Sequence, residues 1–333
     1  MNIIHCKGAL NPNFRRSITD LINCHSPSLL IVTETRVGGA RAKEITDSLP
    51  FDGAMHTDTI GYDGGIWLLW NSDVVDVSIL AATEQEIHAV IKVQSSNFSW
   101  LLSSIYASPR FKKRKILWKN LIHVASLHNL LWLLTRDFDE VLFSDEKFEG
   151  LPIKLRRSEL FHSCLNDCGM IDLGFHGPRF TWSNLRNVGN LIQERLDRGF
   201  ANASWRDAFP KASVHHLTRT HSDHCPVLVC LEKPPCLALL KPFIFQPVWL
   251  SHPSFLELVS HSWDLVLSLD KNIATFTSVV AEWNREVFGN ILWKKKNLTA
   301  RLRGIQISLS TRPSAFLVNQ ERSLRSDYLV VFQ

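Results

Sequence analysis

The spacing of hydrophobic and polar residues predicts helices mixed with short strands over most of the chain. Apolar side chains recur at helical intervals in three early segments, residues 13–24, the stretch after the basic run 110–115 to about 127, and 160–168. Short runs rich in branched and aromatic residues predict strands over 28–33, 66–70, 74–80, 87–93, 98–106, 130–135, 180–182, 195–200 and 227–231. Because strands and helices do not alternate strictly, the pattern favours an α/β sandwich with mixed or antiparallel sheets.

A composition break divides this region from the rest of the chain. Residues 231–236 read Leu-Glu-Lys-Pro-Pro-Cys, and two further prolines follow closely, which is typical of a linker. Beyond it, apolar residues at intervals of three and four predict helices over 255–267, 279–288 and 316–328. We therefore expect a domain over 1–232, a Pro-rich linker over 233–250 and a helical region over 251–333.

Composition and charge describe a folded protein and exclude several classes. Of 333 residues, 45% are apolar and 21% are charged, which excludes disorder and a coiled coil for the whole chain. The net charge of +5 is too small to indicate a nucleic-acid binder by itself. The run Lys294–Lys296 fits either a nucleic-acid module or a solvated helix face, and three lysines alone favour the solvated face.

Cysteines and apolar runs bear on where the protein resides. The seven cysteines show no C-x-x-C pair and no zinc-like spacing, so we interpret them as buried thiols in a reducing compartment. The opening residues lack the features of a signal peptide, and no stretch reaches the roughly 18 apolar residues of a membrane span. We expect an intracellular protein without a membrane partner, nuclear if it is functional.

Acidic residues follow two of the predicted strands. Glu34 comes directly after the strand over 28–33, where a carboxylate can either hold a divalent cation or be an ordinary solvated glutamate. Asp137 and Asp139 follow the strand over 130–135, and their D-x-D spacing puts both carboxylates on one side of an extended chain. Two like charges there favour a bound cation, and a simple turn is the alternative.

Two later segments combine acidic with basic residues. Residues 194–198 read Glu-Arg-Leu-Asp-Arg, which fits a surface strand carrying salt bridges or a strand that brings Asp197 to a site. Asp223 and His224 are adjacent, so a carboxylate can take a metal while the imidazole takes a proton, provided that an acid such as Asp197 orients the ring. A capping turn is the alternative for this pair. Four such segments in order favour a site over four unrelated turns.

Longer segments around these residues resemble the endonuclease/exonuclease/phosphatase superfamily, to which pancreatic deoxyribonuclease and apurinic endonucleases belong. More narrowly, the chain resembles the endonuclease at the amino end of plant LINE-type (non-LTR) retrotransposon polyproteins, continuously over about residues 1–232. The matching segments are 2–10, 32–36, 64–70, 105–109, 137–142, 167–175, 177–184, 194–198 and 222–226. The most specific are DCGMIDLG, residues 167–174, and GPRFTWSN, residues 177–184.

The resemblance implies a fold and a larger protein. The fold would be a four-layer α/β sandwich, two mixed and mainly antiparallel sheets flanked by helices, with a helical C-terminal extension. The extension resembles the connector to a reverse transcriptase, and we expect that enzyme to be absent because the chain reaches Gln333 before any polymerase motif. We expect the region beyond about residue 241 to make few contacts with the sandwich, since its apolar stripes would meet polymerase sequence.

The resemblance also implies Mg²⁺-assisted hydrolysis of a phosphodiester, with Mn²⁺ as the alternative metal. The activity would nick one strand of double-stranded DNA to prime reverse transcription. The implied metal ligands are Glu34, Asp223 and His5, with a hold on His224 as the alternative role of Asp223. The implied DNA-facing residues are Arg179, Trp182 and Asn184, with a core position as the alternative for Trp182.

Four further residues would carry the chemistry that the resemblance implies. His224, oriented by Asp197, would take the proton of the attacking water or polarise the phosphate. Asp137 would activate the water, and Tyr106 would donate a hydrogen bond to the scissile phosphate. A cation would offset the charge that develops on the phosphate in the transition state.

The sequence departs from the family pattern at three positions of this site. His5 stands where the family has an asparagine that helps organise the metal site, and Arg136 where it has glycine. Asp139 takes a catalytic position where the family has a second asparagine, whose amide donates hydrogen bonds toward phosphate or water. An ionised carboxylate only accepts hydrogen bonds and repels phosphate, and an arginine is strained where φ is positive. We therefore expect impaired nicking. The alternative is an inactive remnant that binds DNA or a protein; an activity on phosphoinositide, sphingomyelin or poly(A) is disfavoured by the continuous match.

Overall fold

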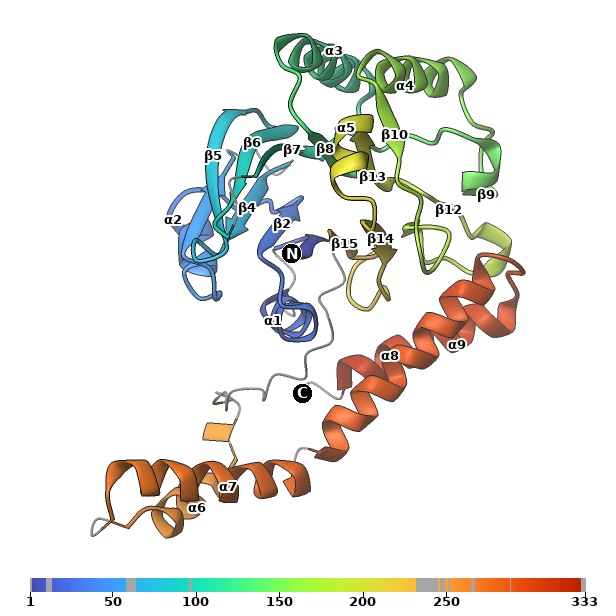
Figure 1. Ribbon diagram of the computed structural model, residues 1–333. Helices are drawn as coiled ribbons and strands as arrows, with labels where there is room; N and C mark the ends of the chain where they lie inside the picture. The colour runs from blue at the N-terminus through green and yellow to red at the C-terminus, as the bar shows by residue number, and fades with distance from the viewer. Residues whose placement is uncertain are drawn as a thin grey trace. The chain divides into compact units, whose positions relative to one another are not determined.

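The structure, a computed structural model, describes residues 2–9, 14–57, 64–95, 98–231, 245, 249–250, 252–264, 267–287 and 289–330. These fall into two compact units, one of residues 1–233 with 302–325 and one of residues 234–301 with 326–333. The first unit contains all the candidate site residues. It is built around two mixed six-stranded sheets (Figure 1).

The first sheet has the strand order β14-β15-β1-β2-β4-β3. Its strands are β1 (Asn2–Lys7), β2 (Leu29–Thr33), β3 (Gly53–His56), β4 (Ile66–Trp70), β14 (Ser213–His216) and β15 (Val227–Cys230). Only the neighbours β1 and β2 run parallel, and the other pairs are antiparallel. All five residues of β2 are buried, as the apolar run in the sequence predicts.

The second sheet has the strand order β10-β13-β8-β7-β6-β5. Its strands are β5 (Val75–Ala82), β6 (Glu86–Val93), β7 (Ser99–Tyr106), β8 (Trp132–Asp137), β10 (Met170–Asp172) and β13 (Asp197–Asn202). The single parallel pair is β7 and β8, so each sheet has one parallel pair. A small third sheet joins β11 (Trp182–Ser183), β12 (Gln193–Glu194) and β9 (Lys147–Phe148).

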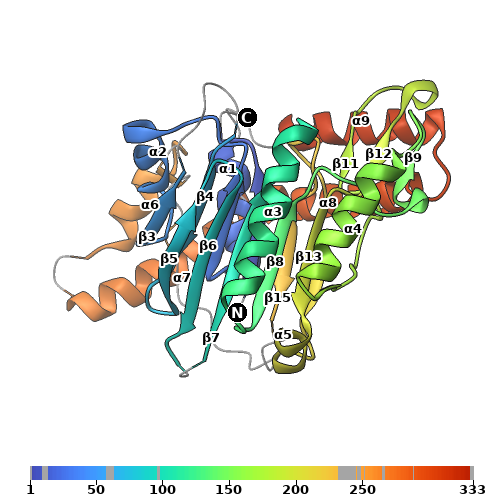
Figure 2. The ribbon, with the colours of Figure 1, turned by 90° about the horizontal axis from the view of Figure 1, so that it is seen from above.

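Helices cover the outer face of each sheet and complete four layers (Figure 1). Helices α1 (Phe14–His25) and α2 (Gly39–Thr46) pack on the first sheet, while α3 (Phe111–Leu127) and α4 (Leu155–Asp167) lie side by side on the second (Figure 2). Helix α5 (Ala203–Ala208) follows β13. One apolar core lies between the sheets and one under each helical layer. The predicted four-layer sandwich is confirmed.

Strand register brings the ends of several strands to one edge of the sandwich. Lys7 at the end of β1 pairs with Thr33 at the end of β2, and Tyr106 pairs with Asp137 at the ends of β7 and β8. Asp197 begins β13 opposite Asp137, because these two strands are antiparallel. The fold therefore gathers residues that lie more than a hundred positions apart in the sequence.

The C-terminal helices divide between the two units. Helices α6 (Phe255–Ser262) and α7 (Leu269–Val287) belong to the second, whereas residues 302–325 of α8 (Gly289–Leu309) and α9 (Ala315–Val330) pack with the sandwich. The expectation of few contacts beyond residue 241 is thus wrong for residues 302–325. The predicted linker 233–250 lies outside the described residues except for 245, 249 and 250. Among the described helices, none is long and apolar enough to span a membrane.

Candidate active site

His224 and Asp197 form a buried pair at the strand-end edge. The Nδ1 atom of His224 lies 2.7 Å from Oδ2 of Asp197, which confirms the predicted hydrogen bond. Thr181 Oγ1 accepts from the backbone N–H of Asp197 at 3.0 Å and helps to fix the start of β13. Burial raises the pKa of Asp197, but the charge and hydrogen bond of His224 outweigh it and hold that pKa well below its usual range. Asp197 is therefore a carboxylate that orients the imidazole.

Asp137 faces the other nitrogen of the same imidazole. Its Oδ2 atom lies 4.0 Å from Nε2 of His224. Asp137, Asp197 and His224 each offer a ligand atom within 4.8 Å of the others, and all three are buried. A buried group of two carboxylates and one imidazole has the donor types that divalent cations bind in proteins.

Lys7 connects His224 to Glu34. The ammonium nitrogen lies 2.9 Å from Nε2 of His224 and 2.8 Å from Oε2 of Glu34. Because Glu34 and His224 both contact the Lys7 nitrogen, their side chains lie well within the roughly 10 Å that a shared metal-phosphate site allows. Since an ammonium only donates, Nε2 accepts here and the ring proton is on Nδ1. Arg36 pairs with the other Glu34 oxygen at 2.5 Å.

Asp223 lies beside this group and is bound to the indole of Trp182. Trp182 Nε1 donates to Oδ2 of Asp223 at 3.0 Å. Burial raises the pKa of Asp223, but the charges of His224 and Lys7 and the indole hydrogen bond together lower it. Asp223 also lines a hollow of about 320 Å³ with Lys7, Gly8, Glu34, Arg36, His221 and Ser222. Trp182 is half-buried, so it contacts the site rather than the core.

The remaining predicted metal ligand, His5, lies between the two sheets. It is fully buried, and Nε2 lies 3.1 Å from the hydroxyl of Thr135. Burial lowers the pKa of His5 well below its usual value, and the charge of Arg136 lowers it further. His5 is therefore neutral, and among the described residues its Nδ1 atom has no hydrogen-bond partner. The site cluster around His224 does not include it.

Arg136 precedes Asp137 in a strained backbone conformation. Its φ of 115° lies in the region that favours glycine, as the glycine of the family pattern predicts. The side chain is fully buried; Nε donates to Thr33 Oγ1 at 2.9 Å and lies 3.8 Å from Asp197. Among the described residues, the two terminal nitrogens have no hydrogen-bond partner. A buried cation with two unpaired donor groups is costly.

Asp139 is also strained and is turned toward a cation. Its φ is 46°, and its backbone N–H donates to Oδ1 of Asp137 at 2.9 Å. The carboxylate pairs with Arg114, a buried residue of α3 that also binds Glu140 at 3.0 Å. Burial and the charge of Asp137 raise the pKa of Asp139 to about 7, although Arg114 opposes the shift. At neutral pH Asp139 therefore exists in both protonation states, and the protonated form can donate a hydrogen bond as an amide does.

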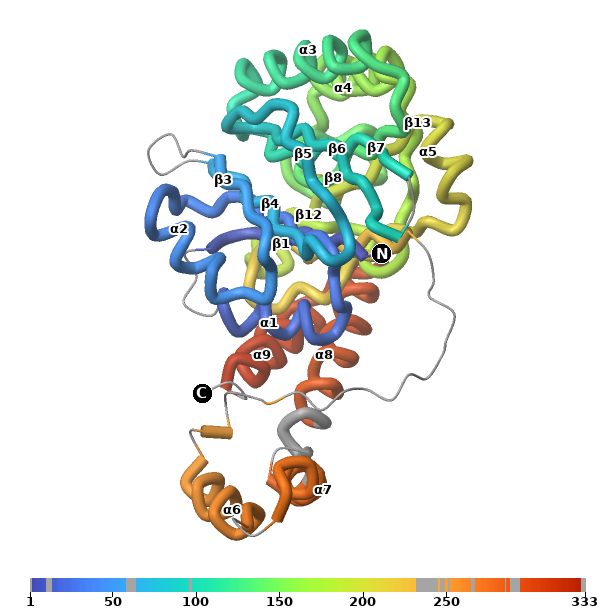
Figure 3. The backbone as a smooth tube through the Cα atoms, turned by 60° about the vertical axis from the view of Figure 1, so that its left-hand side comes forward, coloured from blue at the N-terminus to red at the C-terminus, as the bar shows by residue number. Residues whose placement is uncertain are grey.

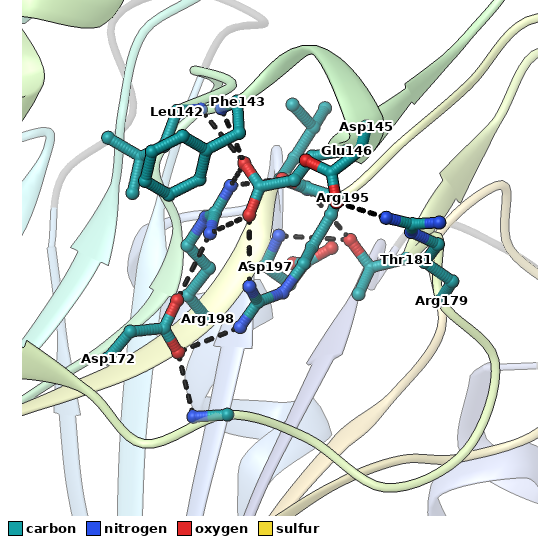
Figure 4. Close-up of polar contacts among 12 residues, drawn as sticks. Leu142, Phe143, Asp145, Glu146, Asp172, Arg179, Thr181, Arg195, Asp197 and Arg198 are labelled. Carbon is teal, nitrogen blue, oxygen red and sulfur yellow. Dashed lines mark hydrogen bonds and ion pairs between the residues drawn. The ribbon is translucent and has the colours of Figure 1, made fainter.

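The arginines beside Asp197 belong to a separate network. Arg195 and Arg198 both bind Glu146 and Asp172 (Figure 4). Glu146 also accepts from the backbone N–H groups of residues 142 and 143. Neither arginine takes Asp197 from His224. The buried network supports the strand that carries Asp197. The segment therefore forms salt bridges, as in the first interpretation, and also brings Asp197 to the site, as in the second.

The two other predicted DNA-facing residues hold surface loops. The Asn184 side chain donates to the carbonyl of Asn190 at 2.8 Å and accepts from the backbone N–H of Ile192 at 3.0 Å, so it closes the loop between β11 and β12. Arg179 is half-buried and pairs with Asp145. Tyr106, at the end of β7, is mostly buried beside Asp137 in the sheet register.

Lys7 and Arg114 are site residues that the sequence reasoning missed. Lys7 ends the strand next to the one that Glu34 follows, so parallel pairing of the two strands would have indicated their proximity. Arg114 lies within the basic run 110–115, where no pattern separates it from its exposed neighbours. Only the packing of α3 on the second sheet reveals its contact with Asp139.

Comparisons with known proteins identify the fold. No family model matches the chain, and no curated protein sequence matches it. Among solved structures, the endonuclease domain of TRAS1, a telomere-specific non-LTR retrotransposon, is similar with a TM-score of 0.54 and 14% identity, over 70% of this chain and 99% of that one. An AP endonuclease from Archaeoglobus fulgidus gives 0.54 and 13%, over 69% and 98%.

A third similar structure is AP endonuclease LMAP from Leishmania major, with a TM-score of 0.53 and 13% identity, over 68% of this chain and 86% of that one. At such identities the likeness concerns the fold. It agrees with the four layers described above. The chain has the DNase-I-like α/β sandwich fold.

Proposed function

We propose that the protein is a Mg²⁺-dependent phosphodiester hydrolase that nicks double-stranded DNA, of the non-LTR retrotransposon endonuclease type. The observation that carries this proposal is the buried pair of Asp197 and His224, with Asp137 facing the second imidazole nitrogen. The structural neighbours of the same fold include nucleases, which supports hydrolysis of a phosphodiester over other chemistries of an imidazole-carboxylate pair.

The residues present fit a divalent cation. Glu34 and Asp223 would supply oxygen ligands. A positive charge already lies beside them in the Lys7 ammonium, which is 2.8 Å from Glu34 and whose charge lowers the pKa of Asp223. Glu34 would be the main ligand and Asp223 a second. When bound, the metal would offset the negative charge that develops on the phosphate.

The chain's own residues divide the proton chemistry between two groups. Asp197 keeps the ring proton of His224 on Nδ1, so Nε2 is the basic nitrogen, and it would accept a proton from water once the Lys7 ammonium no longer donates to it. Asp137, 4.0 Å from that nitrogen, faces the same region and can orient the water. Tyr106 ends the strand beside Asp137, where its hydroxyl can donate to a phosphate oxygen.

Basic side chains near the first turns of α3 and α4 suit a phosphate backbone. Phe111, Lys115, Lys154, Arg156, Arg157 and Leu160 line a surface hollow of about 270 Å³ that includes no carboxylate. Arg114, in the same turn of α3, pairs with Asp139 two residues after Asp137. The basic surface therefore borders the strand-end site, as a DNA-binding face requires.

Arg136 and Asp139 favour a second candidate, an inactive remnant that binds DNA without cutting it. Two strained residues flank Asp137, and one of them brings a buried cation with unpaired N–H groups. The direct test is nicking of supercoiled plasmid with Mg²⁺ and with a chelator. We expect weak nicking that His224→Ala abolishes and that the exposed His162→Ala leaves unchanged; plasmid binding without nicking in all three would establish the remnant instead.

A further inference from the structure

Helices α8 and α9 lie side by side as a hairpin, and their residues 302–325 pack against loops of the sandwich (Figures 1 and 3). The apolar part of this contact joins Leu309 and Val318 to Leu191 of the loop before β12. All three side chains are buried, with at most 6% exposed. Residues 302–325 are thus integrated into the first unit, although about 70 residues separate them from β15 in the sequence.

A buried polar group lies at the centre of the contact. The Gln306 side chain accepts from the backbone N–H of Arg219 at 3.0 Å and donates to the Arg219 carbonyl at 2.8 Å. The Arg219 guanidinium binds Glu321 at 2.9 Å, and Gln306 also donates to Glu321 at 3.0 Å. Arg219, Gln306 and Glu321 are 1%, 2% and 6% exposed. Such a network fixes one backbone geometry, because each broken bond leaves a buried polar group unpaired.

The contacted loop is the one that carries Asp223 and His224. Residues 217–226 contain no strand or helix beyond an isolated bridge at His224, so cross-contacts must hold them. On one side, the backbone N–H of Ser183 donates to the Asp223 carbonyl at 3.0 Å. On the other side, Arg325 of α9 donates to the Ser222 carbonyl at 3.2 Å. The catalytic loop therefore lies between β11 and the hairpin.

We propose that the hairpin over residues 302–325 is a positioning element of the active site, which holds the 219–224 loop so that His224 meets Asp197 and Asp223 meets the metal site. The inference rests on the proposed function, which assigns those roles to Asp223 and His224. Arg325 and Gln306 act through the loop backbone and touch no reacting atom. Helices that the sequence places in a connector thus contribute to the site.

Hydrogen–deuterium exchange of the full chain tests this without requiring nuclease activity. Arg325→Gln removes the donor to Ser222, and we expect amides of 219–224 to exchange about tenfold faster, while β1 and β8 keep their rates. Arg325→Lys keeps a cationic donor and should restore most of the protection. Arg312→Gln, an exposed residue of the turn between α8 and α9, is the matched control and should change nothing.

Gln306→Leu extends the test to the centre of the network and should speed exchange at Arg219 more than Arg325→Gln does. If it fails to fold, the Arg325 variants still decide the question. Unchanged exchange over 219–224 in Arg325→Gln, or an equal rise throughout both sheets, would overturn the positioning role. If the proposed function itself were wrong, the unaltered protein would show no nicking while residues 219–224 were still protected from exchange.

Discussion

The two sides of the active-site edge differ in backbone conformation and in whether the terminal nitrogens of their buried arginines are paired. On the β13 and β15 side, Asp197 and His224 pair at 2.7 Å, and the terminal nitrogens of Arg195 and Arg198 bind acidic partners; among the described residues, Asp197 Oδ1 and the Nε atoms of both arginines have no hydrogen-bond partner. On the β8 side, Arg136 and Asp139 have φ of 115° and 46°, and the Arg136 terminal nitrogens find no hydrogen-bond partner among the described residues. Positive φ and unpaired terminal guanidinium nitrogens therefore coincide in the turn that departs from the family pattern, while Glu34 after β2 also has a positive φ of 50°.

The fold accommodates Arg136 and Asp139, and under the proposed function we expect their effect to fall on the chemistry. Thr33 and Asp197 lie near the Arg136 guanidinium, and Arg114 pairs with Asp139, so the new charges find some partners. Those partners leave the Asp197–His224 pair in place. We therefore predict that His224 is intact as a base and that the turn of Arg136 and Asp139 is impaired in binding phosphate. The variants below test each side.

The largest effect is expected on the β13 and β15 side. Asp197→Asn keeps the shape but removes the carboxylate that holds the ring proton on Nδ1, and loss of such an orienting acid costs about 10⁴ in rate in a comparable triad. Nicking should be measured in the Arg136→Gly/Asp139→Asn background, where we expect the highest activity. The exposed Asp207→Asn is the control. A loss below about tenfold would mean that Asp197 does not orient His224 for catalysis.

Lys7→Met should tighten metal binding. The ammonium contacts Glu34 at 2.8 Å, so a divalent cation must compete with it for that carboxylate. We expect Mn²⁺, followed by electron paramagnetic resonance, to bind about tenfold more tightly to the variant. Lys43→Met, an exposed lysine on α2, should not change the affinity. Weaker binding in Lys7→Met would show that Lys7 supports the metal site.

A smaller effect is expected where Trp182 meets Asp223. Trp182→Phe keeps most of the ring but removes the 3.0 Å hydrogen bond to the carboxylate. A net hydrogen bond of about 1 kcal/mol corresponds to about fivefold in affinity. Mn²⁺ titration of the variant should show that loss. An unchanged affinity would remove Asp223 from the metal ligands.

The last prediction concerns stability on the strained side. The pKa of Asp139 is raised from 3.8 to about 7, so between these values the folded protein holds a proton that the unfolded chain has released. The free energy of unfolding attributable to Asp139 therefore falls as pH rises through this window. Asp139→Asn removes the effect, so its stability relative to the parent should be higher at pH 8 than at pH 5 in urea unfolding. A difference that does not change with pH would contradict the raised pKa.

Much of the sandwich could be predicted because its strands are apolar runs with clear ends. The strand at 66–70 is predicted to the residue, and α3 and β8 end within two residues of the prediction. Strand β1 was not predicted as a strand, since His5 interrupts its apolar pattern, and two-residue strands such as β9 leave no period to detect. The docking of 302–325 depends on Arg219, Gln306 and Glu321, polar residues whose burial no hydropathy pattern indicates.

The site could be predicted in outline and not in its charge balance. Motif order brought Glu34, Asp137, Asp197 and His224 to one cluster of candidates, and the structure places them at one edge. The cations that pair with the acidic residues, Lys7 with Glu34 and Arg114 with Asp139, come from other elements; strand pairing indicates Lys7, whereas only the packing of α3 reveals Arg114.

The double substitution Arg136→Gly with Asp139→Asn tests the central claim most directly. It restores a residue that accepts φ of 115° and a neutral amide beside Asp137, and a recovered amide donor alone is worth about 10² to 10³ in rate. With Mg²⁺ and supercoiled plasmid, we predict that the double variant nicks at least about a hundredfold faster than the unaltered protein, and that His224→Ala in the same background abolishes the gain. Unaltered protein that nicks within about tenfold of the double variant would contradict the account, because the strained turn would then be compatible with catalysis.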